Sequence, residues 1–324
     1  MFTKNADGSI RALAEVALIA QIRRWLGAVA PTSPQGMGDD CAVVDWPIGM
    51  KQILTTDSLS YGQHFDDSVS AHDAGAKLIK RNLSDIAAMG GRPGEALLNL
   101  LCGGDLQTDW LAAFFDGIGE TCQEFDLPIV GGDISTLADG QFTAVLSLTG
   151  YLENPPLLRK GAQDGDALYV TGTLGGSLIK KHYNFKPRLS EGQWLAQSMA
   201  CSALMDITDG LAKDLRELIP DGCAAYLELG KIPLSDAAHQ CANTSGQSAM
   251  EHAFCDGEDY ELLLAVKNNT KLDIFERQWR QKFPSTPLSQ IGLIRKSKSK
   301  APYIDSKSNE ALPWIKGFEH LIDP

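Results

Sequence analysis

Six short segments of this chain place carboxylates beside glycine, serine or threonine. They are Gly38-Asp39-Asp40, Thr55-Thr56-Asp57, Asn82-Leu83-Ser84-Asp85, Gly131-Gly132-Asp133, Asp206-Ile207-Thr208-Asp209-Gly210 and Asp256-Gly257-Glu258-Asp259-Tyr260-Glu261. If several of them converged in the fold, their like charges would repel one another unless cations lay between them. Any fold must therefore keep these segments apart or gather them around cations. Aspartate beside hydroxyl groups and glycine favours magnesium and phosphate.

The length of 324 residues exceeds what one ordinary core accommodates and predicts two domains. Hydrophobic residues make up 44% of the chain and charged residues 22%, which is typical of a folded globular protein. The Asn154-Pro155-Pro156 step is the favoured boundary, because consecutive prolines punctuate regular structure. We therefore expect domains at 1–153 and 154–324.

Several functional classes are disfavoured by composition. The formal net charge of −12 disfavours binding to nucleic acid or to anionic membranes. No run approaches the roughly 18 apolar residues of a membrane span, and Asp7, Arg11 and Glu15 interrupt what would be a signal core. Seven cysteines without a C-x-x-C pair disfavour a disulfide framework and a thiolate zinc site. We expect a cytoplasmic protein without partners of these classes.

Hydrophobic periodicity predicts a mixture of helices and strands in both halves. Helices are expected at 10–26, 71–89, 110–125 and 211–219. Strands are expected at 41–44, 52–55, 96–101, 127–130, 142–148, 167–171, 203–206, 223–229 and 260–266. This pattern is typical of an α+β protein.

Thr55, Thr56 and Asp57 close a predicted strand, so hydroxyl and carboxylate oxygens are presented together. Magnesium prefers such oxygen ligands and combines them with water and substrate phosphates. A single aspartate at a strand end is more often an ordinary turn residue. The magnesium interpretation therefore depends on the number of such segments.

Other motifs also have structural alternatives. The glycines at 131–132 would let a ligand approach the backbone closely. The amides of residues 171–177 would cradle phosphate oxygens, although this loop lacks the Gly-Lys-Ser/Thr ending of a P-loop. Thr208 or Asp209 would equally serve as a helix cap. A lone histidine such as His64 is more often a surface residue, and no Ser-His-Asp grouping has diagnostic spacing. Each of these motifs by itself is weak evidence for a functional site.

Seven motifs follow one another in a fixed order along both halves of the chain. They are Gly36-Met37-Gly38-Asp39-Asp40-Cys41-Ala42, Thr55-Thr56-Asp57, Gly62-Gln63-His64-Phe65, the stretch from Asn82 to Gly90, Gly131-Gly132-Asp133, Asp206-Ile207-Thr208-Asp209-Gly210-Leu211 and Gly257-Glu258-Asp259-Tyr260-Glu261-Leu262. In order, spacing and residue type they resemble the thiamine-monophosphate kinase family, over residues 36–318. This resemblance implies the two-domain α+β fold of the aminoimidazole ribonucleotide synthetase superfamily, with ATP bound between the domains and N-terminal sheets that form a homodimer.

The resemblance also implies roles for individual residues. It assigns magnesium to Asp40, Thr55, Thr56, Asp57, Asp85, Asp133, Asp206 and Asp209, ATP to Gly132, Asp133, Arg159 and Thr208, and the thiamine phosphate to His64, Glu258 and Phe318. The implied reaction transfers the γ-phosphate of ATP to thiamine monophosphate with the help of several Mg²⁺ ions. Because the acceptor phosphate is already nucleophilic, no dedicated catalytic base is expected.

The chain departs from the family pattern at three places. Cys255-Asp256 replaces Ser-Gly, Ile134-Ser135 replaces two threonines, and the stretch between Gly176 and Pro187 is short. Two alternatives therefore remain open. One is another ATP-using member of the superfamily, such as an aminoimidazole ribonucleotide synthetase-like enzyme. The other is a non-catalytic nucleotide-binding homologue. Asp39 and Asp259 have no assigned role.

Overall fold

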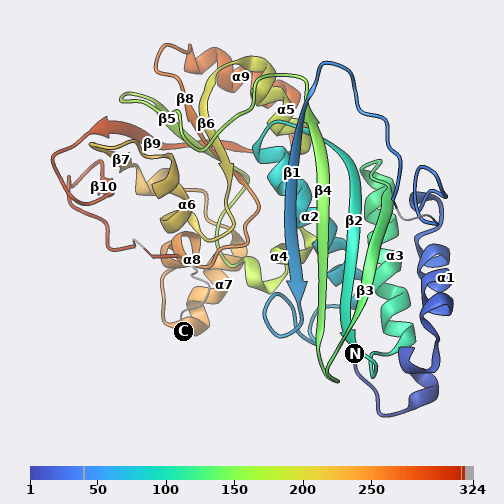
Figure 1. Ribbon diagram of the computed structural model, residues 1–324. Coiled ribbons are helices and arrows are strands. Elements are labelled where there is room, and N and C mark those ends of the chain that lie inside the picture. Colours follow the sequence, from blue (N-terminus) through green and yellow to red (C-terminus); the bar gives the residue numbers. More distant parts are fainter. Residues whose placement is uncertain (39–40, 315, 318–324) are drawn as a thin grey trace. The chain divides into compact units, whose positions relative to one another are not determined.

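The computed structural model describes residues 1–38, 41–314 and 316–317 (Figure 1). Packing divides the chain into two compact units. Unit 1 comprises Met1–Ile86 and Arg92–Glu153, and unit 2 comprises Ala87–Gly91 and Asn154–Pro324. Each unit contains one sheet with helices packed on it, which confirms the predicted α+β class.

Unit 1 is built on a four-stranded sheet with the order β1-β4-β2-β3. Its elements are α1 (Glu15–Leu26), β1 (Lys51–Ser60), α2 (Ala71–Ala88, whose last two residues belong to unit 2), β2 (Arg92–Gly103), α3 (Thr108–Glu124), β3 (Ile129–Leu137) and β4 (Phe142–Leu152). The β2–β3 pair is parallel and the other two pairs are antiparallel. Figure 1 shows α2 and α3 lying along one face of this sheet.

Strand β4 shows why one face of this sheet is buried. Its alternate residues Ala144, Leu146 and Leu148 are buried, whereas Val145 and Ser147 between them are not. This period of two is expected of a strand with one face in the core. Helices α2 and α3 cross closely at Gly75, where an added Cβ would lie 2.0 Å from the Phe114 carbonyl oxygen. Among the described residues of unit 1, the helices cover one face of this sheet and none covers the other face, which is called here the open face (Figure 1).

Unit 2 is built on a six-stranded sheet with the order β10-β7-β9-β5-β8-β6. Its strands are β5 (Ala167–Thr171), β6 (Cys201–Asp206), β7 (Cys223–Leu227), β8 (Leu262–Val266), β9 (Leu288–Lys296) and β10 (Tyr303–Asp305). Its helices are α4 (Lys181–Asn184), α5 (Leu189–Ser198), α6 (Leu211–Leu218), α7 (Asp236–Ser245), α8 (Ala249–Cys255) and α9 (Leu272–Lys282). Strands β5 and β8 are buried along their whole length.

Two hydrophobic cores explain the continuous burial of β5. Leu168 and Val170 face a core that contains Leu215 of α6 and Phe254 of α8. The alternate residues of β5 face a second core that contains α5 and α9 residues, including the fully buried Trp279. A strand in a sheet that is covered on both faces has an unbroken run of apolar residues in its sequence, and residues 167–171 have this pattern.

Some predicted elements differ from the structure. The strand expected at 41–44 is wrong, because this segment has no regular structure and its Val43 is 64% exposed. Strand β1 extends to Ser60, so Asp57 lies inside a strand instead of closing it. Strand β3 likewise continues through Asp133 to Leu137. The apolar runs predict strands that are too short, because the polar residues that follow each run continue the same backbone pairing.

None of the helices in the described part of the chain is long and apolar enough to cross a membrane.

Candidate active site

Unit 1 carries its first group of candidate residues where β1 meets α2. The Thr55 hydroxyl donates a hydrogen bond to the Asp85 carboxylate of α2. Asp57, two residues along the same face of β1, lies 3.5 Å from the Arg81 guanidinium, and Arg81 also donates to the Ser58 carbonyl at 2.6 Å. The tertiary fold therefore joins Thr55 and Asp85, which are separated by 30 residues in sequence.

The second group in unit 1 lies on the open face of the sheet. Thr56 pairs in register with Ser147 of β4, and Asp133 of β3 pairs with Asn99 of β2. Asp133 is exposed, and the Ser135 hydroxyl donates to it at 3.0 Å. Because successive side chains of a strand point to opposite faces, Thr56 and Asp133 are on the other face from Thr55 and Asp57. The sheet thus divides the unit 1 candidates between its two faces.

His64 lies in the turn that follows β1. Its Nδ1 accepts the backbone N–H of Ser60 at 2.9 Å, and its carbonyl accepts a hydrogen bond from the buried Lys77 ammonium at 2.7 Å. Because Nδ1 accepts a hydrogen bond, the proton of the neutral ring resides on Nε2. Nε2 is therefore the hydrogen-bond donor of this ring.

Unit 2 positions its candidates in the turn between β6 and α6. Asp206 is the last residue of β6 and is buried. Asp214 of α6 accepts the backbone N–H groups of Thr208 at 2.8 Å and Asp209 at 3.0 Å, whereas the Asp209 carboxylate lies 2.6 Å from the Lys213 ammonium. The cap residue of α6 is Gly210, so neither Thr208 nor Asp209 caps this helix.

Asp214 is a residue that the sequence analysis did not single out. Burial raises the pKa of its carboxyl to about 7, although the two backbone N–H groups and the charge of Arg159 oppose the rise. Arg159, itself exposed, is therefore close enough to act electrostatically on the end of this turn. The sequence signal for Asp214 is an acidic residue in the first turn of a helix that follows a glycine-ended turn.

Glu258 lies directly against the same turn. Its backbone N–H donates to the Thr208 carbonyl at 2.7 Å, and the Tyr260 N–H donates to the Ile207 carbonyl at 2.8 Å. The φ angles of Glu258 and Tyr260 are +52° and +50°, a region that residues with side chains rarely adopt. The fold thus joins Thr208, expected to contact nucleotide, with Glu258, expected to contact the acceptor. Strained backbone of this kind is concentrated at functional sites.

The glycine-rich loop at 171–177 differs from its sequence-based interpretation. The Gly175 N–H donates to the Asp259 carboxylate at 3.0 Å, and the Gly176 N–H donates to the Asp256 carboxylate at 3.0 Å. These amides are therefore satisfied by carboxylates of the chain itself and do not form a phosphate cradle. Asp256 and Asp259 instead fix the loop in place.

The candidate metal residues have a donor chemistry that suits Mg²⁺. Carboxylate and threonine oxygens are the hard ligands that Mg²⁺ takes. Burial raises the pKa of the Cys102 thiol to about 11 and that of Cys122 to about 12, so these thiols are not thiolate ligands at neutral pH. Among the described residues, no three His, Cys, Asp or Glu side chains are grouped to hold a metal. Asp40 and Phe318 lie outside the described residues.

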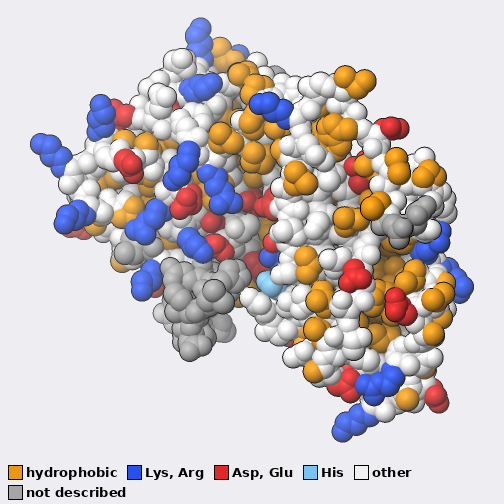
Figure 2. Space-filling view, in the orientation of Figure 1, with side chains coloured by type: hydrophobic (Ala, Val, Ile, Leu, Met, Phe, Trp, Pro, Cys, Tyr) orange, Lys and Arg blue, Asp and Glu red, His pale blue; other side chains and the backbone are white. Residues whose placement is uncertain are grey.

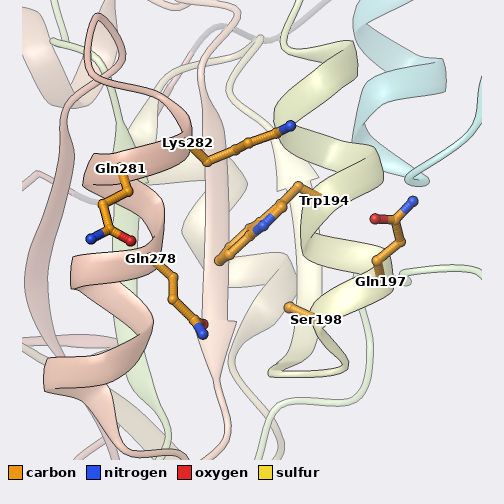
Figure 3. Close-up of a pocket in the computed structure, with 6 residues that line it drawn as sticks. All are labelled: Trp194, Gln197, Ser198, Gln278, Gln281 and Lys282. Carbon is orange, nitrogen blue, oxygen red and sulfur yellow. The ribbon is translucent and has the colours of Figure 1, made fainter.

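A separate groove lies between α5 and α9 of unit 2, with a volume of about 530 Å³. Figure 3 shows Trp194 at its centre, with glutamine side chains on both helices. Its lining residues are Trp194, Gln197, Ser198, Gln278, Gln281 and Lys282. None of the predicted site residues lines this groove, so it is not the candidate active site.

Comparison with known proteins shows what the chain as a whole is similar to. Residues 38–152 match the model of the AIR synthase related protein N-terminal domain. The chain is 38% identical to thiamine-monophosphate kinase of Rhodopirellula baltica (strain DSM 10527 / NCIMB 13988 / SH1), over 82% of this chain and 84% of that protein. It is 31% identical to thiamine-monophosphate kinase of Escherichia coli (strain K12), over 89% of this chain and 92% of the relative.

The same family is found among solved structures. AaThiL complexed with AMPPCP and TMP superposes with a TM-score of 0.70 and 27% identity, and the match covers 97% of this chain and 99% of that chain. This agreement over nearly the whole length confirms the two-domain fold implied by the sequence motifs. The chain belongs to the thiamine-monophosphate kinase family.

Proposed function

We propose that this chain transfers the γ-phosphate of ATP directly to thiamine monophosphate, giving thiamine diphosphate and ADP. The relatives named thiamine-monophosphate kinase support this reaction, and so does the AaThiL complex with AMPPCP and TMP. The observation that carries the proposal within this chain is the hydrogen bond between Glu258 N–H and the Thr208 carbonyl, which places the acceptor and nucleotide candidates side by side.

The residues divide into three proposed groups. Asp40, Thr55, Thr56, Asp57, Asp85, Asp133, Asp206 and Asp209 would hold Mg²⁺; Gly132, Asp133, Arg159 and Thr208 would bind ATP; and His64, Glu258 and Phe318 would bind the thiamine phosphate. Mg²⁺, when bound, would neutralise phosphate charge. Arg81 and Lys213 neutralise Asp57 and Asp209 in the structure, so cation binding at these carboxylates would displace or compete with an existing ion pair.

His64 and Glu258 suit different chemical groups of thiamine monophosphate. The Nε2–H of neutral His64 would donate to the anionic phosphate. The Glu258 carboxylate would repel that phosphate and attract the cationic thiazolium ring or the amino group of the pyrimidine. The acceptor oxygen is already nucleophilic, so these residues orient the substrate and no residue needs to remove a proton.

We propose a homodimer formed through the open face of the unit 1 sheet. Leu54 of β1 is 73% exposed and Leu97 of β2 is 47% exposed, and both lie on this face. Figure 2 shows hydrophobic side chains scattered over the region of β1 to β4. Exposed apolar side chains on an uncovered sheet favour a partner surface. We also propose a cytoplasmic location, where ATP is available.

The direct test supplies the purified chain with ATP, MgCl₂ and thiamine monophosphate and measures thiamine diphosphate by chromatography. We expect one ADP for each thiamine diphosphate, and no product when EDTA replaces MgCl₂. Thiamine in place of thiamine monophosphate serves as the acceptor control and should give no product. Folded protein that binds ATP but forms no thiamine diphosphate would instead support a non-catalytic homologue.

A further inference from the structure

Residues 257–260 form a strained stretch of backbone. Gly257, Glu258 and Tyr260 have φ angles of 75°, 52° and 50°. Glycine accepts this region readily, whereas residues with a Cβ adopt it only when the surroundings hold them there. Two hydrogen bonds from this stretch to Ile207 and Thr208 hold one side of it. Further contacts to this stretch come from a segment that carries no assigned function.

That segment is residues 182–188, which follows the glycine-rich loop. It contacts residues 258–261 at three points. His182 Nδ1 lies 3.6 Å from Glu258 Oε2, and the rings of Phe185 and Tyr260 stack with centroids 3.9 Å apart and planes inclined by 12°. Arg188 donates through Nε and Nη2 to the two carboxylate oxygens of Glu261, each at 2.8 Å. Bidentate pairing and stacking both restrict orientation as well as distance.

The Glu258 side chain is more exposed to solvent than the aromatic side chains of Phe185 and Tyr260. Phe185 is 5% exposed and Tyr260 is 3% exposed, whereas the Glu258 side chain is 21% exposed. The Tyr260 hydroxyl donates to Glu258 Oε1 at 3.1 Å, so the buried tyrosine orients a carboxylate that solvent still reaches. The Glu258 carboxylate on this strained loop is thus held in a defined orientation and stays partly exposed to solvent. Both properties suit a side chain that binds a ligand.

We propose that residues 182–188 are a clamp that sets the position of the Glu258 carboxylate for thiamine monophosphate. In this clamp Phe185 fixes the Tyr260 ring, and Tyr260 orients Glu258, so both are positioning residues. The proposal deepens the proposed function and rests on the role of Glu258 as an acceptor contact. It predicts that loosening the clamp weakens acceptor binding more than nucleotide binding.

The sharpest variant is Tyr260→Phe, which removes one hydroxyl and keeps the stacked ring. The full-length enzyme is assayed with thiamine monophosphate varied at saturating ATP, and then with ATP varied. We expect the KM for thiamine monophosphate to rise about five- to tenfold, because a hydrogen bond to a charged group is lost, while the KM for ATP stays within about twofold.

Tyr169→Phe is the matched control. The Tyr169 hydroxyl donates to Glu276 Oε1 at 2.9 Å in the α9 core, so this variant loses the same kind of hydrogen bond away from Glu258. Both KM values should remain at the wild-type level. A second variant, Phe185→Ala, should raise the KM for thiamine monophosphate and accelerate hydrogen exchange at the Glu258 and Tyr260 amides.

The outcomes separate the clamp from the reaction itself. If the wild-type chain forms thiamine diphosphate but Tyr260→Phe leaves the KM for thiamine monophosphate unchanged, or raises both KM values equally, the clamp is overturned and the reaction stands. If the wild-type chain forms no thiamine diphosphate, the proposed function fails. If Phe185→Ala does not fold, Tyr260→Phe decides the matter alone.

Discussion

Two buried acids of unit 2, Asp259 and Glu261, show how local partners decide ionisation at the residue scale. Burial acts to raise the pKa of Glu261, but Lys181 and Arg188 outweigh it, so its pKa lies below the ordinary value. Asp259 is fully buried and lies 3.7 Å from the Lys181 ammonium, and burial raises its pKa to about 7. Glu261 is therefore ionised at pH 6, whereas Asp259 still largely holds its proton.

This difference predicts a pH-dependent effect of Asp259→Asn on stability. The unfolded aspartate has a pKa of 3.8 and the folded one about 7. Between these values only the folded state holds the proton, so the free energy of unfolding of the wild type falls as the pH rises and levels off above about 7. In Asp259→Asn, residue 259 does not titrate, so this fall in the free energy of unfolding is absent. Relative to wild type, it should gain up to roughly 4 kcal/mol between pH 4 and pH 8.

Urea unfolding of both proteins across that range measures the effect. Asn still offers an oxygen to the Gly175 N–H, so the glycine-rich loop should keep its position in the variant. Parallel stability profiles for the two proteins would contradict a raised pKa for Asp259.

Asp133→Asn tests the proposed metal role of the exposed carboxylate on β3. We expect turnover at limiting Mg²⁺ to fall at least tenfold, because a charged ligand is replaced by a neutral amide that binds Mg²⁺ weakly. The unfolding transition should not change. Kinetics over a range of MgCl₂ concentrations provide the measurement.

The control is Asp139→Asn, another exposed aspartate of unit 1, which pairs with Arg11 at 2.6 Å. It should leave turnover unchanged. Wild-type turnover of Asp133→Asn at low Mg²⁺ would remove Asp133 from the metal group.

At the scale of elements, strand β3 is constrained by its close approach to β2. A Cβ added at Gly132 would lie 1.8 Å from the Leu98 carbonyl oxygen, and real side chains never approach backbone so closely. Gly132→Ala should therefore shift β3 and cost about 1–3 kcal/mol of stability. It should also weaken ATP binding if Gly132 contacts the nucleotide. Urea unfolding and titration with an ATP analogue measure the two effects.

Gly119→Ala provides the matched control in α3 of the same unit. The nearest atom to an added Cβ there is 3.6 Å away, which is an ordinary contact. Alanine in a helix should leave stability unchanged or raise it by about 0.5–1 kcal/mol. Equal stability of the two variants would show that β2 and β3 can separate without cost.

Helices α7 and α8 are joined by a row of three side chains. Ser245 Oγ lies 2.8 Å from His252 Nε2, and His252 Nδ1 lies 2.9 Å from Asp256 Oδ1. This is a Ser-His-Asp grouping that the sequence did not reveal. Its outer members are engaged with backbone, since Asp256 accepts the Gly176 N–H and Ser245 accepts the Gln247 N–H. The row therefore braces the glycine-rich loop against the two helices.

For the whole molecule, the proposed homodimer gives a prediction about mass in solution. Sedimentation of the wild-type chain should give twice the chain mass, and Leu54→Arg should shift it toward the monomer, because a charge would be buried without a partner. Val16→Arg, at an 80% exposed position of α1, is the control and should remain dimeric. A monomeric wild type would contradict the proposal.

The sequence predicted the α+β class and the buried strands of unit 2, because an unbroken apolar run such as residues 167–171 has few alternatives to a core strand. It missed α4, α5, α7, α8, α9, β9 and β10, whose patterns are short or mixed with polar residues. Boundaries also failed where polar residues continue a strand, as at Asp57 in β1. There the backbone pairing with β4 decides the structure, and the side-chain pattern carries little of that information.

The sequence by itself determined the family of this chain and the kind of chemistry open to it, since ordered oxygen-bearing motifs are a property of the chain. Only the tertiary structure decided which motifs meet. It joined Thr55 to Asp85 and Glu258 to Thr208, and it set Asp133 on the other face of the sheet from Asp57. It also turned the glycine-rich loop toward Asp256 and Asp259. These outcomes depend on strand register and on contacts between residues far apart in sequence, which local patterns do not encode.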